Sequence, residues 1–77
     1  MPEIEDIAFK IAAAFEDLYF VPGKKNRFNS VFNRYLPMAD PEGKMVEPYD
    51  AIVELGYKHR AEFDEMIDEL KKLSLIS

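Results

Sequence analysis

Apolar side chains recur at three- and four-residue spacing along most of the chain, which is the period of an amphipathic helix. The first stripe predicts a helix over residues 2–20 and consists of Ile4, Ile7, Ala8, Ile11, Ala12, Phe15, Leu18 and Tyr19. Pro2 suits a first helical turn, and the acids that follow it complement the positive end of the helix dipole. The run Val21-Pro22-Gly23 is expected to end this helix.

A second stripe predicts a shorter helix from about Asn26 to Leu36, with Pro37 as its stop. Its apolar face consists of Phe28, Val31, Phe32, Tyr35 and Leu36. The segment 37–47 is expected to be irregular, with a type I turn at Asp40-Pro41-Glu42-Gly43. The segments on either side of that turn are short. The alternative to an irregular segment is that they pair as a brief hairpin.

The third stripe runs from Glu47-Pro48 to about Leu73 and consists of Ile52, Leu55, His59, Phe63, Met66 or Ile67, Leu70 and Leu73. Gly56 interrupts it and costs about 1 kcal/mol relative to alanine in a helix interior. The unbroken stripe favours one long or gently kinked helix over two helices that meet near Gly56-Tyr57. The sequence therefore predicts a single all-α domain over residues 1–77, a bundle of three main helices, or of four if Gly56 divides the last.

Composition removes most kinds of catalytic site. The chain has 77 residues and no cysteine, which excludes disulfides, thiolate zinc sites and cysteine nucleophiles. His59 is the only histidine, and with Glu62 it would supply two metal ligands where zinc needs three or four. No Gly-x-Ser-x-Gly or Ser-x-x-Lys motif surrounds a serine. We therefore expect no enzyme, no metal and no cofactor.

The net charge of −5 is distributed unevenly along the chain. No acid lies between Asp17 and Asp40. We predict that polar residues in this interval bind a partner or nucleic acid: Lys24, Lys25, Arg27, Asn29 and Arg34. Cations, amides and aromatics interleave here, as nucleic-acid contacts require. The acidic remainder of the chain argues against general affinity for phosphates. An acidic ridge near the C-terminus is expected to be a solvated helix face, or a negative surface for a basic partner: Glu62, Asp64, Glu65, Asp68 and Glu69.

Several aromatic residues do not fall on the apolar stripes: Phe9, Phe20, Tyr49 and Tyr57. Exposed aromatics are enriched at protein interfaces, so we predict Phe20, Tyr49 and Tyr57 as interface residues. The alternative is that they close the ends of the bundle, where a tyrosine buries its ring and keeps its hydroxyl in water.

These patterns together predict a non-enzymatic protein–protein interaction module. By size and fold class alone, it is comparable to the small inhibitors and adaptors of phages and mobile elements. The alternative is a helical nucleic-acid-binding module that uses the basic segment 24–34, and self-association is left open. No apolar run is long enough to span a membrane, and the acidic N-terminus does not have the pattern of a signal peptide, so we expect a cytoplasmic location.

Overall fold

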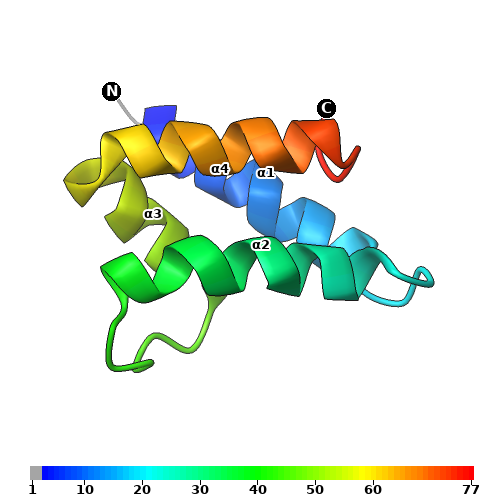
Figure 1. Cartoon of the computed structure of the whole chain (residues 1–77), viewed down its shortest axis with the longest axis horizontal. Coiled ribbons are helices and arrows are strands. Elements are labelled where there is room, and N and C mark those ends of the chain that lie inside the picture. Colours follow the sequence, from blue (N-terminus) through cyan, green and yellow to red (C-terminus); the bar gives the residue numbers. More distant parts are fainter. Residues whose placement is uncertain (1–2) are drawn as a thin grey trace.

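The computed structural model describes residues 3–77 and contains four helices: α1 (Glu3–Asp17), α2 (Lys24–Ala39), α3 (Pro48–Lys58) and α4 (Arg60–Lys72) (Figure 1). No strand occurs in this part of the chain. The all-α prediction is confirmed, and the number of helices is four. The helix start predicted at Pro2 lies outside the described residues.

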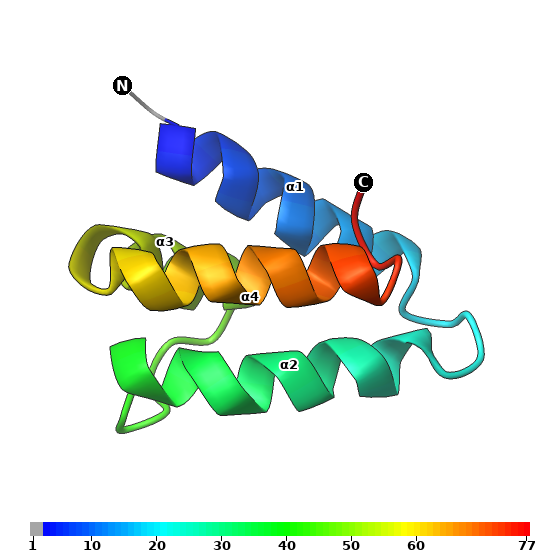
Figure 2. The same ribbon diagram turned by 45° about the horizontal axis from the view of Figure 1, so that its top comes forward.

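The short helix α3 is the centre of the packing. It contacts α1, α2 and α4, and α2 also packs against α4. In the turned view, α4 lies between α1 and α2, with α3 behind it (Figure 2). The largest fully buried side chains come from all four helices: Phe28, Phe63, Ile11, Ile52, Leu55, Met66, Leu70 and Val31. The apolar stripes of the sequence therefore meet in one core.

The prediction of one long C-terminal helix is wrong, because the helix is interrupted at His59, between the end of α3 and the start of α4. The backbone there leaves the helical region, with φ −138° and ψ 64°. His59 nevertheless satisfies both helix ends: its N–H donates to the carbonyl of Leu55 at 2.8 Å, and its own carbonyl accepts from the N–H of Phe63 at 2.9 Å. Leu55 and Phe63 are both fully buried on either side of this corner. The stripe continues through the corner because both helices face the same core, and so its period does not reveal the break.

Gly56 is not the breaking residue, and it lies buried inside α3. A Cβ atom added there would meet the Ile4 Cγ2 well inside contact distance, and would lie 3.2 Å from two ring carbons of Phe63. The glycine therefore allows α1 and the first turns of α4 to approach α3 closely.

The end of α2 also differs from the prediction. The helix continues to Ala39 with Pro37 inside it. A proline in the last turn removes one helical hydrogen bond, and Leu36 and Ala39 pack against the core on either side of it. The alternative of a short hairpin is therefore wrong, because the segment expected to form its first strand belongs to α2.

The turn at Asp40-Pro41-Glu42-Gly43 is present. The N–H of Gly43 donates to the carbonyl of Asp40 at 3.1 Å. The Asp40 carboxylate also accepts from the backbone N–H of Lys44 at 2.9 Å and of Met45 at 3.1 Å. One acidic side chain thus organises the loop that leads into α3.

The first helix ends three residues earlier than predicted, at Asp17, and the chain turns through Leu18–Phe20. Gly23 then adopts φ 83°, a left-handed conformation that glycine reaches without steric cost, and α2 begins at the next residue. Within residues 3–77, no helix has both the length and the apolar character that crossing a bilayer requires.

Candidate functional site

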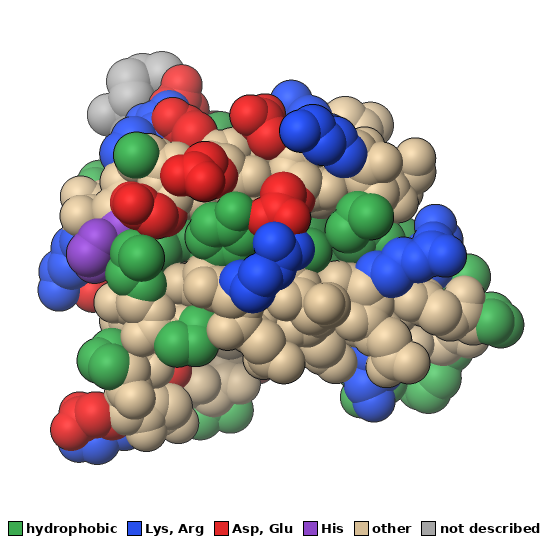
Figure 3. All heavy atoms as spheres, viewed as in Figure 1, with side chains coloured by type: hydrophobic (Ala, Val, Ile, Leu, Met, Phe, Trp, Pro, Cys, Tyr) green, Lys and Arg blue, Asp and Glu red, His purple; other side chains and the backbone are tan. Residues whose placement is uncertain are grey.

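The predicted polar binding residues all lie on α2: Lys24, Lys25, Arg27, Asn29 and Arg34. They do not share one face. Arg27 and Arg34 are seven residues apart, about two turns, and lie on one flank of the helix. Lys25 and Asn29 are four residues apart and lie on the other flank, because the buried stripe that includes Phe28 runs between the two. On the face viewed in Figure 3, Lys and Arg side chains also lie in separate places and form no single patch.

Two of these cations are already engaged within the molecule. The Arg34 guanidinium contacts the Glu69 carboxylate at 2.5 Å, and the Tyr35 hydroxyl donates to the same carboxylate at 2.5 Å. The hydrogen bond to Glu69 is the main cause that raises the pKa of Tyr35 to about 12. The same two donors, Tyr35 first, lower the pKa of Glu69. The Lys25 ammonium lies 4.4 Å from the ring centroid of Tyr19, a cation–π contact.

The start of α2 has an unusual electrostatic arrangement. Its first turn carries Lys24, Lys25 and Arg27 and no acid, although the N-terminal end of a helix is itself positive. Each cation there costs up to about 1 kcal/mol when it is unpaired. The positive potential is therefore concentrated at the N-terminal end of α2 rather than spread along segment 24–34.

Two of the three predicted interface aromatics meet in one groove. Phe20 and Tyr49 both line a hollow of about 440 Å³ between the C-terminal end of α1 and the segment that enters α3. Phe20 is 91% exposed, and Val46, which also lines the groove, is 93% exposed. We call this hollow the α1–α3 groove; its lining consists of Ala12, Phe15, Glu16, Tyr19, Phe20, Val46, Glu47, Pro48 and Tyr49.

A chain of aromatic rings connects this groove to the core. Phe15 packs edge-to-face on Phe28 with ring centroids 5.4 Å apart, and on Tyr19 at 5.5 Å. Tyr19 in turn packs edge-to-face on Phe20 at 5.0 Å. Tyr49 is packed against the core from the first turn of α3. The walls of the groove are therefore anchored to the hydrophobic core, and its exposed edges are Phe20 and Val46.

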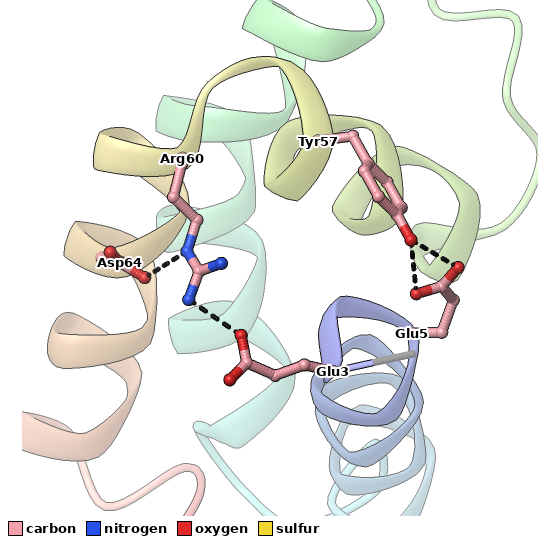
Figure 4. Close-up of polar contacts among 5 residues, drawn as sticks. All are labelled: Glu3, Glu5, Tyr57, Arg60 and Asp64. Carbon is pink, nitrogen blue, oxygen red and sulfur yellow. Dashed lines mark hydrogen bonds and ion pairs between the residues drawn. The ribbon is translucent and has the colours of Figure 1, made fainter. Parts of the chain in front are cut away.

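The third predicted interface aromatic, Tyr57, lies at the other end of α3. Its hydroxyl donates to the two carboxylate oxygens of Glu5, each at 2.8 Å (Figure 4). This hydrogen bond raises the pKa of Tyr57 above its ordinary value of 10.0. In the same region, Arg60 contacts Glu3 and Asp64, each at 3.1 Å. These contacts tie the start of α1 to the corner between α3 and α4.

Sequence reasoning did not include Val46, Glu16 and Glu47 in the candidate site. Val46 lies in the irregular segment before α3, where no periodicity marks an apolar residue as buried or exposed. The available signal in the sequence was Phe9, an apolar residue off the first stripe and about two helical turns before Glu16, so that both share one flank of the helix. In the structure Phe9 is 66% exposed.

The acidic ridge lies along α4, where acidic side chains gather on the face seen in Figure 3. Two of its members are paired, Asp64 with Arg60 and Glu69 with Arg34. Among residues 3–77, no three His, Asp or Glu side chains are grouped as metal ligands.

No family model, curated protein or solved structure matches this chain. Its function can therefore be assigned only on the geometry and chemistry of its own residues.

Proposed function

We propose that this protein is a non-enzymatic interaction module that binds another protein through the α1–α3 groove. The observation that supports this most is the exposure of two large apolar side chains, Phe20 and Val46, at the edges of one hollow. Burial of such a side chain contributes about 1.5–3 kcal/mol. A partner that covers both would gain this energy, and the free protein leaves it unused.

The rigidity of the groove also favours binding. Phe15 and Tyr49 are half-buried and packed against the core, so the walls are formed before a partner arrives. A preformed site reduces the entropy lost on association. Large aromatic anchors surrounded by polar residues are typical of the energetically important centre of a protein interface.

The positive N-terminal end of α2 supports a second candidate, in which nucleic acid binds Lys24, Lys25 and Arg27. The cations there reinforce the helix dipole, which attracts phosphate groups. Engagement of Arg34 with Glu69 reduces the length of this basic surface. For this reason we place nucleic-acid binding second.

A capture experiment with matched variants tests the proposal. The tagged full-length chain is incubated with lysate of its source organism, with and without nuclease. We expect protein bands that survive nuclease and that are lost with the double variant Phe20→Ser/Val46→Ser. The high exposure of both side chains means that this variant should keep its fold, which circular dichroism checks. The control variant Lys24→Glu/Arg27→Glu should retain the bands.

The opposite pattern would contradict the proposal. If the groove variant captured the same proteins as the unmodified chain, the groove would not be the binding surface. If the bands disappeared with nuclease and with Lys24→Glu/Arg27→Glu, nucleic acid would be the ligand.

A further inference from the structure

We infer that the partner segment in the α1–α3 groove is an amphipathic helix that presents apolar anchors flanked by lysine or arginine. This inference rests on the proposed function and concerns the chemistry of the occupant. Three features support this inference: the length of the apolar surface, the helical secondary structure of the groove walls, and the negative charge of the rim.

The apolar surface continues beyond the groove along α1. Phe9 is 66% exposed and lies on the same flank of α1 as Ala12 and Ala13. At 1.5 Å per residue, Phe9 to Asp17, where α1 ends, spans roughly 12 Å, and Phe20 lies in the turn that follows. The facing flank of α3 carries Tyr49 and Val53, which are both half-buried. A bound helix of about two to three turns would match this surface, with anchors at the spacing i, i+4 and i+7.

The backbone around the groove favours a helix over an extended peptide. The walls of the groove are two helices and the turn segments beside them, and residues 3–77 contain no strand. An extended peptide gains much of its affinity by adding to a free strand edge, and the described part of the chain has no such edge. A helix satisfies its own backbone hydrogen bonds, so it can lie on apolar side chains without leaving peptide groups unpaired.

The charge around the groove identifies the polar side of the occupant. Glu16 and Glu47 belong to the lining, and Asp50 is the neighbour of Tyr49 in the first turn of α3. Among residues 3–77, no lysine or arginine forms an ion pair with any of these three acids. One cation contacts the lining, because the Lys25 ammonium lies over the Tyr19 ring. The rim is therefore negative overall and complements a cationic segment.

A second copy of this chain fits less well. Two copies that met through this face would bring Glu16 and Glu47 of each copy close to the same acids of the other, and each chain carries a net charge of −5. Like charges that face each other across an interface oppose association. Self-association through this face is therefore the competing outcome of the test.

The test uses three labelled synthetic peptides of about five helical turns. The first has leucine at helical i, i+3, i+4 and i+7 positions and lysine elsewhere. The second keeps the leucines and replaces every lysine with glutamate, and the third keeps the first composition with two central prolines that prevent a helix. Fluorescence anisotropy measures binding to the full-length chain at several salt concentrations. We expect the first peptide to bind at least about tenfold more tightly than the other two.

Variants of the chain locate the binding. Phe20→Ser/Val46→Ser should weaken binding of the lysine peptide by about tenfold or more. Glu16→Gln/Glu47→Gln should weaken it and reduce its dependence on salt. The matched control, Glu65→Gln/Asp68→Gln, removes the same charge from exposed positions on α4 and should change affinity by less than about twofold.

Several outcomes would overturn the inference. These are equal affinity for the three peptides, equal losses for the rim and α4 charge variants, or a dimer in sedimentation velocity that Phe20→Ser/Val46→Ser converts to a monomer. The proposed function has a separate test, and it fails if capture of the lysate proteins does not depend on Phe20 and Val46. If those proteins depend on the groove and the peptides show no preference for a basic helix, the proposed function stands and this inference is wrong.

Discussion

Replacement of Gly56 by alanine tests how closely α1, α3 and α4 pack at the centre of the fold. The added methyl group would overlap the Ile4 Cγ2 and lie 3.2 Å from the Cδ1 and Cε1 atoms of Phe63. Phe63 is fully buried, so its ring has no space to retreat. Ile4 is β-branched, and its Cγ2 moves only if the χ1 angle or the backbone of α1 changes.

Two energies of opposite sign decide the result. Overpacking of a core costs about 1–3 kcal/mol. Alanine is about 1 kcal/mol better than glycine in a helix interior. Because neither neighbour can yield easily, we expect the overpacking cost to be in its upper half and Gly56→Ala to destabilise the fold by about 1–2 kcal/mol. In a domain of this size, 1 kcal/mol shifts the melting temperature by about 4–8 °C, so the loss corresponds to about 4–16 °C.

Urea unfolding monitored by circular dichroism gives the free energy of unfolding. The pair Asp68→Ala and Asp68→Gly, at an exposed interior position of α4, measures the helix-propensity difference in this chain without a packing change, and the glycine variant should be about 1 kcal/mol less stable than the alanine variant. In the background Ile4→Ala, which removes the Cγ2, Gly56→Ala should become much less destabilising, and the difference is the coupling energy of the pair. If Gly56→Ala alone were as stable as the unmodified chain, the close approach of α1 to α3 would be wrong.

Two further predictions concern the polar contacts. The hydrogen bond from Tyr35 to Glu69 should stabilise the fold only between an acid and an alkaline limit. Because the pKa of Glu69 is lowered in the folded protein, the stabilisation is lost as the pH falls below 4.5 through that lowered pKa. Because the pKa of Tyr35 is raised, the stabilisation is also lost as the pH rises from 10.0 towards about 12. The difference in unfolding free energy between the unmodified chain and Tyr35→Phe, measured against pH, should therefore shrink at both ends, and a difference independent of pH would contradict the contact. Asp40→Ala should remove two backbone hydrogen bonds from the loop before α3 and speed hydrogen exchange at the amides of Lys44 and Met45 by about tenfold or more, with little change in the exchange of the buried helices.

The periodic positions of apolar residues determined the fold class and most of the core. Phe28, Val31, Ile52, Leu55 and Phe63 are buried as the stripes predict. This succeeds because a helix that must bury one face imposes its period directly on the sequence. The turn at Asp40 was also readable, since proline and glycine at its second and fourth positions suit local turn geometry that needs no distant contacts.

Tertiary packing decided the features that one helix alone does not specify. The break at His59 keeps the apolar period intact, and Pro37 stays helical because Leu36 and Ala39 pack beside it. The groove depends still more on packing, since Phe20 and Val46 are distant in sequence and lie in segments without a period. They line one hollow only because α3 docks against α1, and this docking depends on contacts at Gly56 that no local pattern encodes.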